Sequence, residues 1–434
     1  MMLPALALWL LQDLNSDFET HYTKVRESTA RADFHPRLTP RYSKGDELSA
    51  LAIEASQRLP WSGGSLSAAA LFRDASDLPP PSSHSSELRL TLTQPLLRGF
   101  GPNTSYYDLT NSRRARQGQE RAYELSRQRL AIQVASAFYQ VVQQRQLLLV
   151  ARQSLERSEN LMRASDARLK VGLASKLDLF RAQLQASQAR DAMIRAQASL
   201  GNALEYFRFL LALPPTDPVE PEAVGLPELP AEGPEPLEAL VARALAQRLE
   251  LHEARDQVDD TRRGTRLARQ NLLPQLDLNL ALVQTGFGPS FGSAFPGPDR
   301  RIGFFLTTSF PLERTADRAN RAIAELNEAA SRRALRQREL EVEAEVRAAL
   351  RELSRIRESV ELQRAAVDVA EQQRRLADLR YERGLASNFD VVDAEASLVA
   401  ARSALVGLLT SYQIARLELR RVTGGFDPAR EFRP

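Results

Sequence analysis

Residue types that commonly carry chemistry are few in this chain of 434 residues. The absence of cysteine excludes disulfides, thiolate metal ligands and a nucleophilic thiol. The four histidines are scattered without metal-ligand spacing: His21, His35, His84 and His252. No P-loop, nucleophile elbow or metal motif appears, and the lone GFG at 99–101 is only a weak glycine signal. We therefore expect no enzyme activity, no cofactor and no metal site.

Three aspartates stand out because they follow a repeated turn motif. RLKVGLASKLDLFRAQ (168–183) matches RYERGLASNFDVVDAE (380–395) without a gap. In each copy a glycine that can adopt the left-handed conformation ends one helix, and a serine with an aspartate three residues later begins the next as a capping box. These residues are Gly172, Ser175 and Asp178 in the first copy, and Gly384, Ser387 and Asp390 in the second.

Asp393 differs from the capping aspartates. It lies three residues after Asp390 on the same helix face, too far along to cap that helix. Its counterpart in the first copy is Arg181, so the two turns are not electrostatically equivalent. Asp393 can be either a solvated surface acid or a functional acid. Asp178 and Asp390 can act as helix caps alone or have a second role as well.

The turn motif is part of a duplication that covers nearly the whole chain. LRLTLTQPLLR (88–98) matches FFLTTSFPLER (304–314), and FHPRL (34–38) matches LLPQL (272–276), in the same order. The order predicts a first structural repeat at 1–213 and a second at 237–423. The Pro/Glu-rich residues 214–236 connect them, and 424–434 form a C-terminal tail.

Each repeat is predicted to place its turn at the end of a long helix. Residues 103–170 and 315–382 are rich in Ala, Leu and charged residues, and neither has an internal proline. Each would be ~100 Å long if straight, so it must pack lengthwise against other long helices. Shorter helices are expected at 175–211, 237–271, 387–423 and 5–32 as their partners.

A second type of pattern precedes each long helix. Leu276, Leu278, Leu280 and Leu282 alternate with polar or small residues, which predicts a strand with one apolar and one polar face. Strands are expected at 275–311 in the second repeat and at about 37–97 in the first. The first repeat has candidates at 47–58, 64–73 and 86–97, with a possible short strand near 37–42, so four or six strands per chain remain open. One chain's strands cannot close a membrane barrel alone, so several chains must cooperate.

The strand-to-helix junctions QPLLRGFG (94–101) and FPLER (310–314), together with the two GLAS turns, resemble the outer membrane efflux protein (TolC) family. The resemblance implies a mainly α fold with membrane β structure. Duplicated long-helix hairpins would form a trimeric α-barrel tunnel across the periplasm, joined to a shared transmembrane β-barrel. It also implies an outer-membrane channel subunit of a tripartite efflux or type I secretion system in a Gram-negative bacterium. Its partners would be two further copies, a periplasmic adaptor, an inner-membrane pump and outer-membrane lipid.

The resemblance also assigns roles to residues of the turns. Asp390 and Asp393 match an acidic ring at the periplasmic entrance, and Asp178 and Tyr381 match the link that holds it closed. The basic member of that link has no match, because Ala386 follows Leu385. We therefore expect fewer contacts to hold the entrance closed. The turn motifs that would contact the adaptor are Gly172, Leu173, Ser175, Gly384, Leu385 and Ser387.

Two features favour a different interpretation and keep an alternative open. No secretory signal is evident, and the repeat alignment predicts that Met1–Leu11 begins the first helix. A soluble coiled-coil scaffold, or a degenerate relative that is not exported, is therefore the alternative.

Mixed charge along the helices, with a net charge of +3, argues against a nucleic-acid partner. The sequence does not identify the cargo, the pump or the adaptor.

Overall fold

The computed structural model describes residues 21–45, 48–75, 84–214, 225–227, 229–230, 235–290, 292–295, 297 and 300–428. The predicted helix start at Met1–Leu11, most of the 214–236 connector and most of the 424–434 tail lie outside these residues. The chain forms two compact units, one built from two segments and the other from three. One holds all the strands (17–122 and 250–338), and the other is helical (1–16, 123–249 and 339–434).

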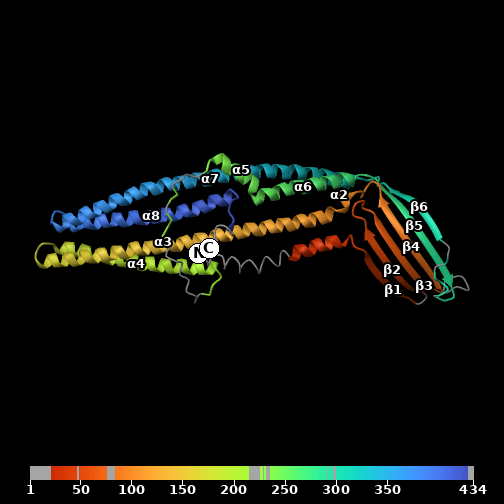
Figure 1. Cartoon of the computed structure of the whole chain (residues 1–434), viewed down its shortest axis with the longest axis horizontal. Helices are drawn as coiled ribbons and strands as arrows, with labels where there is room; N and C mark the ends of the chain where they lie inside the picture. The colour runs from red at the N-terminus through yellow and green to blue at the C-terminus, as the bar shows by residue number, and fades with distance from the viewer. Residues whose placement is uncertain are drawn as a thin grey trace. The chain divides into compact units, whose positions relative to one another are not determined.

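The strand-containing unit is built on one six-stranded antiparallel sheet in the chain order β1 to β6 (Figure 1). The strands are β1 (Arg37–Lys44), β2 (Leu48–Arg58), β3 (Ser65–Ala75), β4 (His84–Pro95), β5 (Gln275–Gly288) and β6 (Arg300–Ser309). The sequence left open whether each chain has four or six strands, and the described residues form six. The possible short strand near 37–42 is a full strand, paired from Arg37↔Ser56 to Lys44↔Ser49.

The register gives the sheet one apolar and one polar face. Cross-strand partners share a face. One row of partners is Leu38, Ala55, Ala68, Leu90, Leu282 and Ile302. The next row, on the opposite face, is Arg37, Ser56, Ser67, Thr91, Ala281 and Gly303. On the polar face, Thr93 Oγ1 donates to Asn279 (2.9 Å), and Asn279 Nδ2 donates to Thr307 (3.0 Å). These two rows therefore cross all six strands.

Helices at one end of the sheet complete this unit. They comprise residues 21–32, α2 (Pro102–Ser105), the beginning of α3 (Tyr107–Lys170), α6 (Leu249–Gln270) and the beginning of α7 (Thr315–Glu382). Asp256 of α6 forms ion pairs with both Arg114 and Arg121 of α3, each with an N–O distance of 2.6 Å. Polar and ionic contacts of this kind join α6 to its neighbours, so these helices are not held by apolar packing alone.

The helical unit contains two hairpins whose turns lie at the same end (Figure 1). One is formed by α3 with α4 (Lys176–Leu210), and the other by α7 with α8 (Asn388–Val422). Val141 of α3 and Phe207 and Leu211 at the end of α4 form a buried core between the arms of the first hairpin. Near the second turn, Ala377 and Tyr381 of α7 pack on Val391 and Ala394 of α8.

Two predicted helices are interrupted. The segment expected at 103–170 breaks at Tyr106, which separates the short α2 from the 64-residue α3. The segment expected at 237–271 breaks at Arg248 into α5 (Leu237–Gln247) and α6. Arg248 has an extended backbone (φ −68°, ψ 127°), and its buried side chain pairs with Glu345. The helix therefore breaks at a residue whose buried guanidinium reaches a partly exposed glutamate of α7.

Candidate functional site at the hairpin turns

Both turns end their long helix in the same way. Gly172 and Gly384 have φ of +76° and +73°, which is the left-handed region that favours glycine. The next amide, that of Leu173 or Leu385, donates 2.8 Å to a carbonyl five residues earlier, at Arg168 or Arg380. The glycine amides donate to Leu169 and Tyr381 (3.0 and 3.1 Å), which completes a Schellman motif in each copy.

The helices that follow begin with the predicted aspartate contacts. The amide and hydroxyl of Ser175 donate to Asp178 at 3.1 and 2.7 Å, and those of Ser387 donate to Asp390 at 2.7 and 2.8 Å. The hydrogen bonds from the serine side chain, followed by those from its amide, hold the pKa of each aspartate below its ordinary value. Both carboxylates therefore stay ionised to lower pH than a free aspartate.

Tyr381 lies at the contact between the two hairpins. Its ring is buried against α8, and its hydroxyl is 3.1 Å from that of Ser165 on α3. Buried Asn388 at the start of α8 donates 2.7 Å to the carbonyl of Asp178 on α4. Asp178 and Tyr381, paired by resemblance, thus belong to one contact region, although the Asp178 carboxylate bonds to Ser175.

Arg168 supplies a basic group to this region from an unexpected position. Its guanidinium carbon lies 4.1 Å from the centroid of the Tyr381 ring. Its two terminal nitrogens donate to the carbonyls of Tyr381 (2.7 Å) and Glu382 (3.1 Å). Arg168 therefore places a basic group beside Tyr381, although no basic residue follows Leu385. Comparison of the two repeats does not reveal this role of Arg168. Its counterpart in the second repeat is Arg380, which lies near Asp390.

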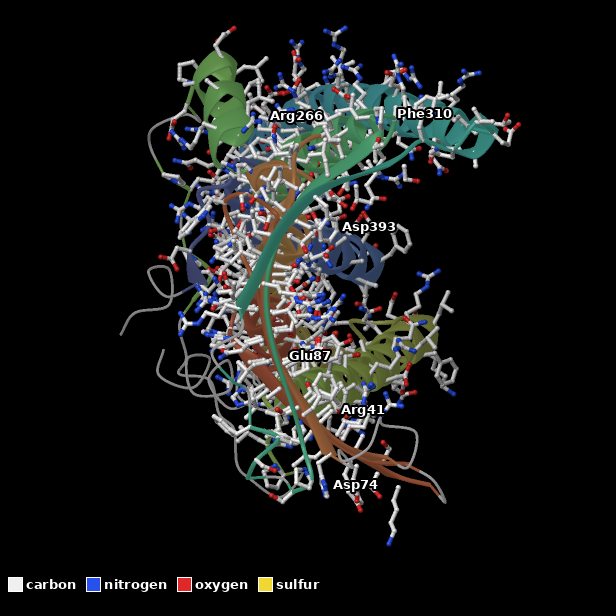
Figure 2. All side chains as sticks on the ribbon, turned by 90° about the vertical axis from the view of Figure 1, so that its right-hand side faces the viewer. Arg41, Asp74, Glu87, Arg266, Phe310 and Asp393 are labelled. Carbon is white, nitrogen blue, oxygen red and sulfur yellow. The ribbon has the colours of Figure 1, made fainter. Side chains whose placement is uncertain are left out.

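Asp393 is exposed on α8, between buried Val391 and Ala394, and Figure 2 labels it on that helix. Neither Asp393 nor its counterpart Arg181 has a hydrogen-bond or ion-pair partner among the described residues. The apolar side chains at the turns are also largely exposed: Leu173 is 78% and Leu385 76% exposed. The turns thus present exposed leucines and, at Asp393, an exposed carboxylate without such a partner among the described residues.

A buried ionic cluster lies about two helical turns from the second turn. Glu395 of α8 is 3% exposed and accepts from Arg157 of α3 at 2.8–3.0 Å. Arg374 of α7 donates to the same carboxylate at 3.0 Å and also pairs with Asp378. This cluster joins three helices of both hairpins. The sequence did not reveal this cluster, because acidic and basic residues are mixed around Glu395 as they are around many solvent-exposed acids.

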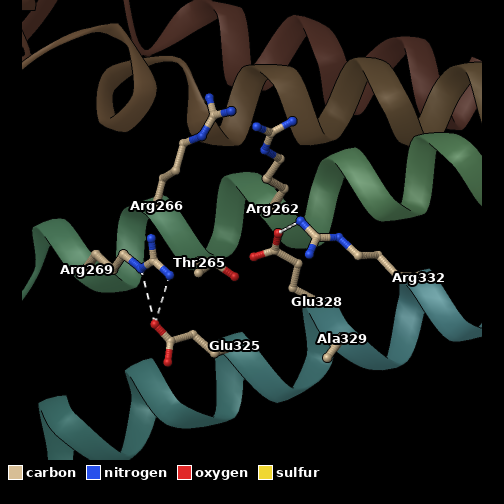
Figure 3. A pocket seen from close by; sticks show the side chains of 8 residues that line it. All are labelled: Arg262, Thr265, Arg266, Arg269, Glu325, Glu328, Ala329 and Arg332. Atoms are coloured by element: carbon tan, nitrogen blue, oxygen red, sulfur yellow. Dashed lines mark hydrogen bonds and ion pairs between the residues drawn. The ribbon is translucent and has the colours of Figure 1, made fainter.

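A separate cavity of about 510 Å³ lies in the strand-containing unit, between α6 and α7 (Figure 3). Its lining is mainly ionic: Arg262, Thr265, Arg266, Arg269, Glu325, Glu328, Ala329 and Arg332. Arg269 donates to Glu325 across the helices (3.0 Å), and Arg332 donates to Glu328 along α7 (2.5 Å). The buried Thr265 hydroxyl is 3.1 Å from the Ala324 carbonyl. These contacts describe the packing of two charged helices.

Two further features are absent from the described residues. No cluster of three or more His, Cys, Asp or Glu residues there could hold a metal ion. Within the same residues, no helix is long and apolar enough to span a membrane.

Comparison with known proteins identifies the family. The model of the outer membrane efflux protein family matches residues 29–213 and 240–425. The chain is 24% identical to outer membrane protein TolC of Escherichia coli over 365 residues, which cover 81% of this chain and 71% of TolC. It is 25% identical to outer membrane protein OprJ of Pseudomonas aeruginosa over 320 residues, covering 70% and 63%.

Solved structures agree with these sequence matches. The outer membrane protein VceC of Vibrio cholerae superposes with a TM-score of 0.71 at 16% identity, covering 98% of this chain and 95% of VceC. The open state of the MtrE channel of Neisseria gonorrhoeae gives 0.66 at 17% identity, covering 98% and 88%.

The fold is that of a TolC-like outer-membrane channel, with long helical hairpins and a β domain. The chain belongs to the outer membrane efflux protein family, as the resemblance predicted. Members of this family are efflux channels in the outer membrane of Gram-negative bacteria, so the channel function and location predicted from the sequence are confirmed.

Proposed function

We propose that three copies of this chain form a passive export duct with a shared β-barrel in the outer membrane. The observation that carries the proposal is the six-stranded sheet with one apolar face and two open edges. On that apolar face, Leu90 is 40%, Leu280 41% and Ile302 83% exposed within the single chain. An apolar face of this extent is stable in lipid, and open strand edges are stable there only when further strands close the barrel.

The hairpin turns are proposed to meet a periplasmic adaptor, through which an inner-membrane pump engages the duct. Leu173 and Leu385 support this role because each projects from a rigid Schellman turn into solvent. Gly172 and Gly384 set the turn conformation, and Ser175 and Ser387 fix where the next helix begins. An adaptor with an apolar pocket for a leucine on each hairpin would fit these turns.

The contacts around Tyr381 are proposed to hold the periplasmic entrance closed. Arg168, Ser165 and Asn388 supply direct hydrogen bonds between the hairpins, while Asp178 orders the helix whose carbonyl Asn388 contacts. Asp390 and Asp393 would repeat three times about the trimer axis as an acidic ring. Six carboxylates at a constriction attract cations and repel anions.

The two halves of the chain are proposed to be structural repeats, at 1–213 and 237–423. Support comes from the parallel order of strands, long helix, Schellman turn and shorter helix in both halves. The duct is proposed to need no catalysis and no cofactor, since the pump would select and drive the cargo. Two relatives are named as the outer membrane proteins of an antibiotic efflux pump and of a toluene efflux pump.

Native mass spectrometry of the detergent-solubilised full chain tests the assembly. The expected species has three times the chain mass and contains both helix and β structure by circular dichroism. A stable monomer in detergent would refute the shared barrel. A water-soluble dimer without β signal would instead support the coiled-coil scaffold.

A further inference from the structure

The cavity between α6 and α7 has a counterpart in the first half of the chain. This second cavity, of about 420 Å³, is lined by residues of the helix at 21–32 and of α3: Lys24, Glu27, Ser28, Arg31, His35 and Arg116. The match of FHPRL (34–38) with LLPQL (272–276) has an offset of 238 residues. The same offset relates the ends of the two shorter helices, at 32 and 270. Both cavities therefore lie beside the same part of the repeated pattern.

Most lining positions correspond between the two cavities. The shorter helices are related by the offset above, and the long helices by the offset of 212 residues between the two turns. The corresponding lining positions are Lys24 and Arg262, Glu27 and Thr265, Ser28 and Arg266, Arg31 and Arg269, and Arg116 and Glu328. A cavity that recurs with equivalent lining belongs to the repeated architecture and is not a chance gap between two helices.

In the first cavity the chain itself supplies an anion. The side chain of Glu27 is 12% exposed, and its carboxylate lies 2.9 Å from a nitrogen of Arg31 and 2.9 Å from one of Arg116. Arg113 donates to the same carboxylate at 3.3 Å. Burial alone would raise the pKa of Glu27, but the hydrogen bond from Arg113 and the charges of the three arginines hold this pKa below its ordinary value. This position therefore stabilises an oxyanion among guanidinium groups.

In the second cavity the corresponding position carries no charge. Thr265 is 2% exposed, and its hydroxyl lies 3.1 Å from each of two backbone carbonyls. The two carboxylates of the lining are already paired. Glu325 accepts from Arg269 at 3.0 Å, and Glu328 accepts from Arg332 at 2.5 Å. Four arginines line the cavity, so two of them are left over by these pairs.

The two remaining arginines are Arg262 and Arg266. They lie one helical turn apart and extend from the same side of α6 (Figure 3). Neither has a hydrogen-bond or ion-pair partner within the part of the chain that the structure describes. Like charges four residues apart on a helix destabilise it. An anion bound between the two guanidinium groups would remove this repulsion, and both side chains are exposed to solvent, from which it could bind.

We propose that the cavity between α6 and α7 binds a phosphate-bearing anion through Arg262 and Arg266. A phosphate group carries a charge of about −1.5 to −2 near pH 7, which matches two unpaired guanidinium groups. Guanidinium forks also bind phosphate oxygens in a bidentate manner. The cavity of about 510 Å³ admits a molecule larger than phosphate itself, so the group belongs to a soluble compound or to a lipid headgroup. All lining residues lie in one unit of one chain, so the inference does not depend on the proposed trimer.

Equilibrium dialysis of the detergent-solubilised full chain against radiolabelled inorganic phosphate tests the site, at an ionic strength of about 0.15 M. Saturable binding is expected. The double variant Arg262→Gln with Arg266→Gln should weaken it about tenfold or more, because it removes charge-assisted hydrogen bonds. The matched control is Arg333→Gln with Arg336→Gln. These two exposed arginines of α7 lie outside the cavity lining, so their removal makes the same change in net charge and should leave the affinity unchanged.

Native mass spectrometry after incubation with phosphatidylglycerol in detergent distinguishes the two sources of the phosphate group. A lipid retained by wild type and by the control, but lost from the Arg262/Arg266 variant, identifies a headgroup as the ligand. Saturable binding of inorganic phosphate without such lipid retention identifies a soluble compound. The proposal is overturned if wild type shows neither saturable phosphate binding nor arginine-dependent lipid retention. It is also overturned if both double variants lose binding equally, because net charge alone would then account for it.

Discussion

Arg168 of the first hairpin covers the ring of Tyr381 of the second, with the guanidinium carbon 4.1 Å from the ring centroid. The same arginine donates to the carbonyls of Tyr381 and Glu382. These two carbonyls lie at the end of α7, where the last helical carbonyls lack an intrahelical donor. Arg168 therefore adds a second donor to the Tyr381 carbonyl, which also accepts from the Gly384 amide, supplies one to the Glu382 carbonyl, and stacks on the buried tyrosine.

Replacing Arg168 by alanine should raise the open probability of the channel in planar lipid bilayers. The change removes a cation–π contact worth about 0.5–1 kcal/mol and two charge-assisted hydrogen bonds worth roughly 1.5–3 kcal/mol each. Even about 1.4 kcal/mol favours the open state tenfold. Arg168→Lys should have an intermediate effect, since it keeps the charge but loses the fork that reaches both carbonyls.

Arg163→Ala is the matched control for Arg168. Arg163 lies on the same helix and donates only to Asn160 of that helix, at 2.5 Å. Its removal should leave the open probability unchanged. An equal increase for both arginine variants would mean that Arg168 acts through net charge and not through Tyr381.

Removal of Asp393 should weaken the block of ion current by multivalent cations added on the periplasmic side. Asp393→Ala, alone or with Asp390→Ala, removes carboxylates proposed to encircle the constriction. Trimer stability should hardly change, because Asp393 is exposed. Asp191→Ala, at an exposed acid of α4 that pairs with Arg195, is the control. Identical block in wild type and the double variant would leave Asp390 and Asp393 as surface acids.

The cap at Asp178 should make the first hairpin sensitive to acid. Its pKa is lowered in the folded chain, so its contribution to stability is complete above the ordinary value of about 3.9 and is lost as pH falls through the lowered value. Asp178→Ala should cost roughly 1 kcal/mol near neutral pH, as the loss of a helix cap does. The unfolding midpoints of wild type and variant should converge as pH falls. A constant difference down to the most acidic pH would show that the carboxylate charge is not responsible.

Glu395→Ala should destabilise the helical unit strongly. Glu395 is shared by Arg157 and Arg374, and its loss leaves both arginines without this carboxylate in a largely buried site. Breaking a buried ion pair from one side costs about 3–5 kcal/mol. Denaturant unfolding followed by circular dichroism measures the loss. The exposed pair of Glu159 with Arg190 is the control, and Glu159→Ala should cost less than about 1 kcal/mol. Comparable losses for both variants would contradict a special role for Glu395.

Local patterns in the sequence predicted the elements that local physics determines. The Gly and Ser residues around Leu173 and Leu385 predicted both turns, because a left-handed glycine and a helix cap depend on a few adjacent residues. Alternation around Leu280 predicted a two-faced strand. Neither pattern fixed the strand number, because the mixed sequence of β1, RLTPRYSK, alternates weakly and contains a proline.

Features that depend on residues far apart in the chain were not predictable from one sequence. Arg168 and Tyr381 are separated by 213 residues, and Arg157 and Glu395 by 238. The partner of Arg248 at the helix break, Glu345, is likewise 97 residues away. Each of these charged residues sits in a segment where Arg, Glu and Asp are frequent. Pairing therefore required the packing of the helices, which composition and periodicity do not specify.

Ion current through the purified full-length protein in a planar lipid bilayer tests the central claim most directly. A trimeric duct should give discrete conductance steps, and the Arg168→Ala variant should spend more time open than wild type. Trivalent cations added on one side only should block the current, because the acidic ring would lie at one end of the duct. If trimers insert stably into the bilayer but neither wild type nor Arg168→Ala conducts, the chain does not form a passive duct.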